Sequence, residues 1–226
     1  MKILELFAGS RSIGGAGEEV GHTVWSTDLY AFEGIDKAQS ILELNPNDVP
    51  FVPDMIWASP PCTYFSVASI GKHWNKDNTP KSDNAMLGVE IVKATMVIIE
   101  HFLKLNPNLV WYIENPRGKL RKLDFMLKFT DRCDGVRHTV TYCQYGDTRM
   151  KPTDIWTNNI QWQPKPICKN GDPCHVSAPR GSSTGTQGLK GNYERSKIPK
   201  DLCDEIIKVS TNIKSKQLGL DEFIEF

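Results

Sequence analysis

The chain has 226 residues, of which 39% are hydrophobic and 24% charged, a composition typical of a globular protein with one sizeable core. Its 27 Lys and Arg balance 27 Asp and Glu, so any surface that binds phosphates has to be local. No apolar run approaches the roughly 20 residues that span a bilayer, and the N-terminus is too soon charged for a signal peptide, so we expect a cytoplasmic protein with no membrane attachment.

Strands and helices alternate along most of the chain. Short apolar runs that end at Gly, Pro or Asp predict strands, and longer segments with apolar residues at helical spacing predict helices. This alternation predicts an α/β fold, with helices on both faces of the sheet and a nucleotide site at the carboxyl ends of the strands. We expect strands at 2–7, 22–27, 54–58, 109–113, 138–143 and 153–157, helices at 12–20, 85–105 and from Pro199, a loop at 66–84 and a weakly structured tail after Lys214.

A glycine-containing turn, Phe7-Ala8-Gly9-Ser10, follows the first strand. Glycine permits a close approach of the backbone to a ligand, and the helix beyond offers free N–H groups. Asp28 ends the second strand about 20 residues later, where a carboxylate can accept hydrogen bonds from both hydroxyls of a ribose. The pattern favours an adenosine-containing cofactor, and the lack of a true Gly-x-Gly-x-x-Gly disfavours NAD. The alternatives are an ordinary strand-to-helix turn and a helix-capping role for Asp28.

Two further strand ends carry reactive side chains. Two prolines precede Cys62 and stiffen its turn, and a thiol beside a cofactor cleft is positioned to act as a nucleophile. The next strand ends in Glu114-Asn115-Pro116, where partial burial is expected to raise the pKa of Glu114, and a protonated carboxyl can donate to a ring nitrogen. Asn115 would fix Glu114 or the thiol loop. The alternatives are a small buried residue at Cys62 and a helix-capping Glu-Asn pair.

Five elements of the chain follow one another in a recognisable order: Phe7-Ala8-Gly9, Asp28, Pro61-Cys62 with Phe65-Ser66, Glu114-Asn115 and Arg149-Met150-Lys151. This set resembles the cytosine-5 DNA methyltransferase family, in a compact form of the kind carried by bacteriophages and prophages. The resemblance extends over residues 1–160 and 195–210. It implies a Rossmann-like class I sheet that binds S-adenosylmethionine (AdoMet), a small loop-rich C-terminal insert, and methylation of cytosine in DNA after the base is flipped out of the stack.

The resemblance also implies roles for single residues. Cys62 would attack C6 of the cytosine, Glu114 would protonate N3 or hydrogen-bond to it, and a base would remove the C5 proton after methylation. Arg149, Lys151 or both would contact the base or the thiol loop, and Asn115 would support Glu114. The implied cofactor contacts are Phe7, Ala8, Gly9, Ser10, Ser12, Asp28, Leu29, Pro60 and, as a weak candidate, Asp48; the implied DNA contacts are Ser66, Lys72 and Trp74 in a loop expected to be mobile, and Arg180 and Gln187.

The chain departs from the family pattern at three motifs. Thr63 stands where the family has Gln, Pro116 where it has Val, and Ser196-Lys197-Ile198-Pro199 where it has Gly-Asn-x-x-Pro. The target-recognition region is short, which leaves the target sequence and activity on duplex DNA open. We divide the chain into a catalytic domain at 1–157, a reduced recognition insert at 158–195 and a C-terminal helix at 196–226.

The insert and two basic segments supply the remaining candidates. Cys168, Cys174 and His175 are weak candidates for zinc ligands, with Cys143 or Cys133 as a fourth, and free thiols are the alternative. The six cysteines are scattered, so a disulfide framework is not expected. The basic segments 72–81 and 117–128 would contact phosphates or form solvated surface, and the Gly-rich stretch 180–188 would read bases or form a flexible loop.

Three other functions compete with cytosine-5 methylation. Ser59-Pro60-Pro61 resembles the turn of amino-methyltransferases that act on an exocyclic nitrogen, although Cys62 replaces the aromatic residue expected next. A non-catalytic binder that keeps the fold is the second alternative, and an enzyme acting on RNA or free nucleotides is the third. We expect a monomer, located in the cytoplasm of a bacterial host if a phage encodes it; a restriction partner is left open.

Overall fold

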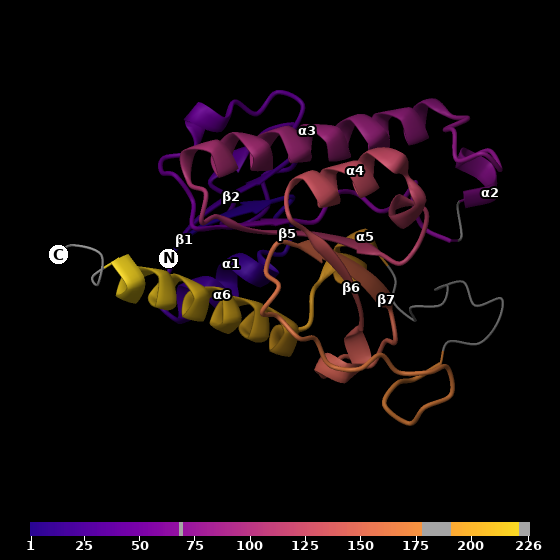
Figure 1. The fold of residues 1–226 in the computed structure, drawn as a ribbon. Coiled ribbons are helices and arrows are strands. Elements are labelled where there is room, and N and C mark those ends of the chain that lie inside the picture. Colours follow the sequence, from indigo (N-terminus) through magenta and orange to yellow (C-terminus); the bar gives the residue numbers. More distant parts are fainter. Residues whose placement is uncertain (68–69, 178–190, 222–226) are drawn as a thin grey trace.

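The computed structural model describes residues 1–67, 70–177 and 191–221, and a seven-stranded sheet forms its centre (Figure 1). The strand order is β3-β2-β1-β4-β5-β7-β6. β1 to β5 are parallel, and β7 is antiparallel to both of its neighbours. This is the order typical of class I AdoMet methyltransferases, so the predicted fold class is confirmed.

The bounds of the elements agree with the predicted order of strands and helices. The strands are β1 (Lys2–Leu6), β2 (Thr23–Asp28), β3 (Lys37–Ala38), β4 (Met55–Ala58), β5 (Val110–Pro116), β6 (Val136–Thr141) and β7 (Pro152–Thr157). The helices are α1 (Ser12–Glu19), α2 (Ile70–His73), α3 (Asp83–Leu105), α4 (Asp124–Arg132), α5 (Asn192–Ser196) and α6 (Lys200–Asp221), with short 3-10 turns η1 (Pro46–Asp48), η2 (Leu120–Lys122) and η3 (Tyr142–Tyr145).

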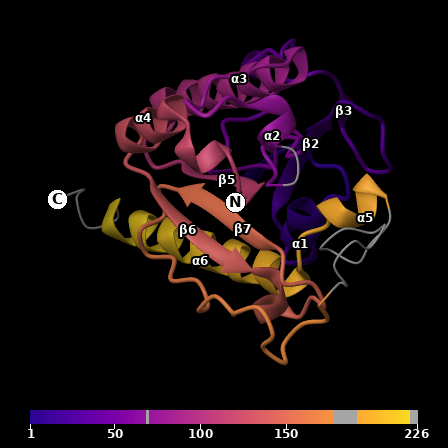
Figure 2. The same cartoon turned by 90° about the vertical axis from the view of Figure 1, so that its right-hand side faces the viewer.

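Both faces of the central strands are apolar and buried. Successive side chains of a strand point to opposite faces, so Leu4 and Ile56 pack beneath α3 and α4, whereas Ile3 and Trp57 pack against α1 and α6. Figures 1 and 2 show these two helical layers on either side of the sheet. Within the described residues, no helix has the length and hydropathy that a membrane span requires.

The structure adds β3, α4 and α5, which were not predicted, and it differs from the prediction at three further segments. β5 continues through Glu114 and Asn115, because both residues pair with β7 instead of following the strand. The segment 66–84 contains α2, and a bridge joins Trp74 to Pro80. The last helix continues to Asp221, so the backbone after Lys214 is helical and not weakly structured.

Candidate active site

A pocket opens at the carboxyl ends of β1 and β2, where the fold predicts a nucleotide. Two of its polar atoms, Thr27 Oγ1 and Gln39 Oε1, are buried and have no hydrogen-bond partner among the described residues. Buried polar groups are normally satisfied, so these two atoms indicate that a ligand with polar groups belongs here. The pocket is lined by Phe7, Thr27, Asp28, Leu29, Gln39, Ser40, Ile41, Pro61 and Ile91.

Asp28 fixes the glycine turn beside this pocket. Its Oδ2 accepts from the backbone N–H of Gly9 at 3.0 Å, and its Oδ1 accepts from that of Tyr30 at 3.1 Å. Both donors lie in loops, so the predicted alternative of a helix cap is wrong. A carboxylate offers about four lone-pair sites, so both oxygens can also accept from a ligand.

Of the other predicted cofactor residues, Ser10 and Ser12 support the glycine turn, and Asp48 lies away from the pocket. Ser12 Oγ lies 2.8 Å from Ser10 Oγ and accepts from the N–H of Ile198 at 3.2 Å, which joins the turn to the chain before α6. Asp48 forms an exposed ion pair with Lys37 at 2.8 Å and does not line the pocket, so it is not placed for an adenine contact. The sequence reasoning missed Gln39 and Ser40, which follow the two-residue strand β3 and carry no motif.

The turn that carries Cys62 is held from several sides. Asn115 Nδ2 donates to the carbonyl of Pro60 at 2.9 Å, as expected for a residue that fixes the thiol loop. The carbonyl of Cys62 accepts from the N–H groups of Phe65 and Ser66 at 3.0 and 3.1 Å. A Cβ on Gly118 would lie 2.2 Å from the carbonyl oxygen of Phe65, so only glycine lets the segment after β5 approach the turn. The position of the thiol is therefore set by backbone contacts.

The thiol of Cys62 is half-buried, and the charges of Glu114, Lys151 and Arg195 act on it. Burial raises its pKa above the ordinary value, the carboxylate of Glu114 raises it further, and the ammonium of Lys151 lowers it. Glu114 and Lys151 therefore both lie within electrostatic reach of the Cys62 thiol. The raised pKa keeps the thiol protonated at neutral pH in the absence of substrate.

Glu114 is held by a residue that the sequence did not indicate. Its Oε1 accepts from the hydroxyl of Tyr142 at 3.0 Å, and both side chains are buried. Burial and the adjacent carboxylate raise the pKa of Tyr142 well above its ordinary value, so Tyr142 stays a hydrogen-bond donor. No sequence motif marks Tyr142, because it reaches Glu114 only through the placement of β7 between β5 and β6.

Arg149 is bound to groups within the protein, and it does not make the predicted contact with the base or the thiol loop. Its guanidinium pairs with Asp147 and lies 5.7 Å from the centre of the Tyr142 ring. Burial alone would raise the pKa of Asp147, but the hydrogen bonds from Arg149 lower it below the ordinary value. The remaining donors of Arg149 reach the backbone carbonyls of Glu194, Arg195 and Lys197.

Lys151 combines both kinds of contact. Its Nζ donates to the carbonyl of Arg195 at 3.0 Å and lies 4.5 Å from the centre of the Tyr142 ring. Lys151 is also one of two cations that lower the pKa of Cys62, and Arg195 is the other. Of the two predicted cations, Lys151 acts on the Cys62 thiol through its charge, whereas the guanidinium of Arg149 is paired with Asp147.

Trp74 is not placed to contact DNA. Its indole is buried in the core, and Nε1 donates to the carbonyl of Tyr64 at 2.7 Å. Ser66 forms a bridge with Gly118, and Lys72 is exposed. Arg180, Gln187 and the rest of the Gly-rich stretch lie outside the described residues.

Several cations of the two basic segments are also engaged inside the protein. His73 is buried against Ser82, and the buried Lys119 lies 5.3 Å from the centre of the Trp74 ring. Arg121 pairs with the buried carboxylate of Asp154. Lys72, Lys76, Lys81, Arg117, Lys122 and Lys128 stay exposed, so any phosphate-binding surface in these segments reduces to them.

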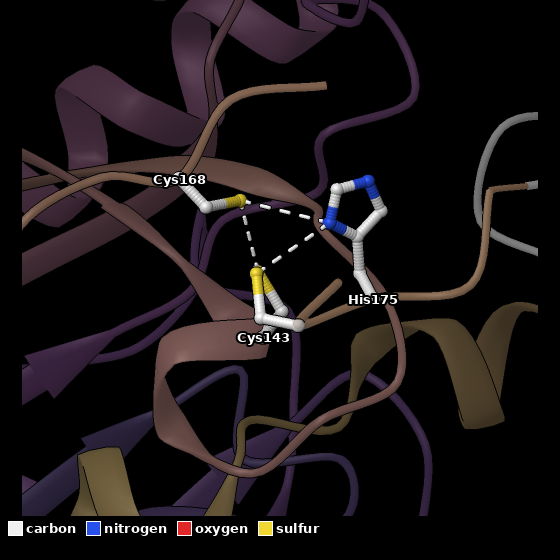
Figure 3. Close-up of side chains that lie close together, drawn as sticks. Cys143, Cys168 and His175 are labelled. Atoms are coloured by element: carbon white, nitrogen blue, oxygen red, sulfur yellow. Dashed lines mark hydrogen bonds between the residues drawn. The ribbon is translucent and has the colours of Figure 1, made fainter. Parts of the chain in front are cut away.

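Three cysteines and a histidine gather beside the β6–β7 connection. The sulfur of Cys143 lies 3.0 Å from that of Cys168 and 3.6 Å from that of Cys174, and His175 Nδ1 lies 3.8 and 3.7 Å from the latter two. Figure 3 shows the side chains of Cys143, Cys168 and His175 pointing toward one another. Cys133 is buried in the core beneath α3 and α4, so Cys143 is the fourth member of the cluster.

The chain is similar to known methyltransferases in sequence and in fold. No family model matches the chain. The chain is 27% identical over 219 residues to a protein of Frog virus 3 (isolate Goorha) described as a probable DNA (cytosine-5)-methyltransferase, and the match covers 86% of this chain and 92% of that protein. Among solved structures, the Entamoeba histolytica methyltransferase EhMeth is 11% identical, with a TM-score of 0.51, over 70% of this chain and 52% of its own. Spodoptera frugiperda DNMT2 is 19% identical, with a TM-score of 0.47, over 71% and 51%. The chain thus spans about half the length of these two solved proteins, and the likeness to EhMeth supports the fold.

Proposed function

We propose that this chain, a relative of the DNA (cytosine-5) methyltransferases, transfers a methyl group from AdoMet to C5 of cytosine in DNA, with Cys62 as the nucleophile. One observation carries the proposal. The proline turn that lines the pocket leads directly into Cys62, and the charges of Glu114 and Lys151 act on that thiol. A pocket for a donor and a nucleophile with its supporting charges therefore meet at one turn.

The pocket suits AdoMet. Asp28 would accept hydrogen bonds from the ribose hydroxyls, and the apolar side chains of Leu29, Ile41 and Ile91 would contact the adenine. The unpartnered Thr27 Oγ1 and Gln39 Oε1 would accept from polar groups of the same ligand. When bound, AdoMet supplies a methyl group that is electrophilic because it is attached to a sulfonium.

Cytosine C5 is a poor nucleophile until a group adds at C6, and a thiolate is the strongest side-chain nucleophile near neutral pH. The Cys62 thiol would give its proton to solvent, and the Sγ–C6 bond would form as the ring electrons move toward N3 and C5. Glu114 would protonate N3 or hydrogen-bond to it and so stabilise this adduct, and Lys151 would favour the thiolate. After C5 is methylated, the C5 proton leaves to a base and the electrons of that bond expel Cys62.

Two groups would hold the protein side of this reaction in place. Asn115 fixes the backbone before Cys62, and Tyr142 holds one oxygen of Glu114 so that the other can face the substrate. A base flipped out of the duplex would have to enter between these side chains. We propose that the insert at 158–195 is a reduced recognition region. Few residues would then contact the bases that define the target sequence.

The reaction is tested by transfer of tritium from labelled AdoMet to genomic DNA, followed by nucleoside analysis. We expect 5-methylcytosine as the labelled nucleoside. Recovery of N4-methylcytosine or N6-methyladenine alone would overturn the proposal in favour of an amino-methyltransferase. Parallel assays with duplex DNA, single strands, RNA and dCMP identify the form of substrate, and label in RNA or dCMP alone would replace DNA as the substrate.

The nucleophile is tested by trapping on DNA that contains 5-fluorocytosine, where the missing C5 proton prevents release of the thiol. We expect a covalent complex with the native chain and none with Cys62→Ala, whose methyl transfer falls by a factor on the order of 10³ or more. Cys133→Ala is the matched control, because Cys133 is a buried cysteine outside the site. A trapped complex with Cys62→Ala would exclude Cys62 as the nucleophile.

A further inference from the structure

The segment 163–177 has no hydrophobic core of its own. Cys168 is its one buried side chain, and the rest are exposed or half-buried. A turn at Lys169–Asp172, in which Gly171 has a φ of 94°, reverses the chain and brings Cys174 back to Cys168. A short loop without apolar burial needs another source of stability to overcome the entropy of ordering it.

The four side chains at this turn have the chemistry and the spacing of a metal site. Their ligand atoms, three sulfurs and His175 Nδ1, all lie within 4.8 Å of one another. Tetrahedral zinc has Zn–S bonds of about 2.3 Å and Zn–N bonds of about 2.0 Å, which separates the ligand atoms by about 3.5–3.8 Å. The distances of 3.6 to 3.8 Å match this range, and the 3.0 Å between Cys143 and Cys168 needs only a small outward shift.

Neighbouring groups orient the ligands. The N–H of Cys168 donates to Thr141 Oγ1 at 3.0 Å, and Gln144 Nε2 lies 3.4 Å from the sulfur of Cys174. Just beyond His175, the N–H of Val176 donates to the carbonyl of Thr148 at 2.9 Å. Such outer contacts are characteristic of built metal sites, because they fix the direction of each ligand before the ion binds.

We propose that Cys143, Cys168, Cys174 and His175 bind one structural Zn²⁺ ion. Four protein ligands close the coordination sphere, so the ion has no open position for catalysis. Three thiolates and a neutral imidazole leave the centre with a net charge of −1. The ion fastens the segment 163–177 to the connection between β6 and β7, one residue from Tyr142, the donor to Glu114.

The first test is the metal content of the full chain. The protein is purified from medium without added zinc, and its zinc is measured by inductively coupled plasma mass spectrometry. We expect close to one zinc per chain. After removal of zinc, reconstitution with Co²⁺ is expected to give the thiolate charge-transfer and visible bands of a tetrahedral sulfur-rich site. A chain that purifies without zinc and gives no such Co²⁺ spectrum would overturn the proposal, as would a disulfide among the three thiols.

Variants separate this site from other thiols. Cys174→Ser and His175→Ala change exposed or half-buried ligands, and each is expected to weaken zinc binding by more than the roughly 10–100-fold that loss of an outer contact causes. His175→Cys should retain the metal, and Cys133→Ala should bind it as the native chain does. Unchanged zinc affinity in Cys174→Ser and His175→Ala would refute the site. The readout is metal content, so the result does not depend on the methyltransferase activity.

Discussion

Some polar side chains at the ends of β1 and β2 differ from two arginines beside β6 and β7 in how they are partnered. At the ends of β1 and β2, Thr27 and Gln39 keep buried polar atoms without a partner among the described residues, and Asp28 retains accepting capacity. Around β6 and β7, the cations Arg149 and Arg121 are engaged with buried or partly buried carboxylates. The open polar atoms at the ends of β1 and β2 suit a ligand, whereas Arg149 and Arg121 hold segments of this chain together.

Substitution of Arg149 is expected to have the largest effect on stability, and it tests whether the arginines anchor the antiparallel half. Arg149→Met leaves Asp147 and three backbone carbonyls without their donor, so we expect a loss of about 3–5 kcal/mol in the free energy of unfolding. Urea denaturation measures it. The control is Arg132→Met, which removes an exposed ion pair with Glu100 and should cost less than about 1 kcal/mol. Equal losses in the two variants would show that Arg149 does not anchor this half.

Glu5 gives the parallel half a pH dependence of its own. Glu5 accepts from the N–H groups of Ile13 and Gly14, but its burial raises its pKa from 4.5 to about 7. The folded state therefore binds this proton more tightly than the unfolded state. The contribution of Glu5 to stability is fully present below pH 4.5, and about 3 kcal/mol of it is lost as pH rises through 7.

The variant Glu5→Gln removes this titration. Unfolding free energies of the native chain and the variant, measured from pH 5 to pH 8, are expected to converge or cross as pH rises, because only the native chain loses the contribution of Glu5. The difference between the two curves cancels every other titrating group. A constant difference across this range would show that burial does not hold Glu5 protonated.

The smallest expected effect concerns ligand binding at Asp28, and it rests on the proposed function. Asp28→Asn removes the charge that accepts the ribose hydroxyls, and hydrogen bonds to charged groups contribute about 1.5–3 kcal/mol, so AdoMet should bind roughly 10–100-fold more weakly. Calorimetric titration measures the affinity. Asp48→Asn, at an exposed acid outside the pocket, should bind AdoMet as the native chain does. Equal affinities of both variants would remove Asp28 from the site.

The sequence predicted the parts of the site that depend on one strand end at a time. Asp28 and Cys62 each follow a short apolar run, so their place at the carboxyl edge of the sheet could be inferred from the pattern of residues alone. Gln39 and Tyr142 could not, because neither carries a motif. Gln39 depends on the two-residue strand β3, and Tyr142 depends on the reversed direction of β7.

The misassigned residues share one cause, which is that residue type does not report burial. Trp74 and Lys119 suit a DNA-binding surface by type, but the indole packs into the core and the lysine covers it. Arg149 has the charge expected of a catalytic cation, but Asp147 lies two residues before it and neutralises it.

Helix α4 was missed because Leu123, Met126 and Phe129 form too short an apolar pattern between charged residues.

The anchoring of both ends of the insert has a consequence for protein engineering. The chain is fastened at Val176 by a hydrogen bond to Thr148, and it is fastened again at 194–198 by Arg149, Lys151 and Ser12. Between these two fixed points, segments of different length or origin could be exchanged while the geometry around Cys62 stays the same. Exchange of residues 178–190 therefore tests, within the proposed function, whether this stretch sets a preference for a DNA target.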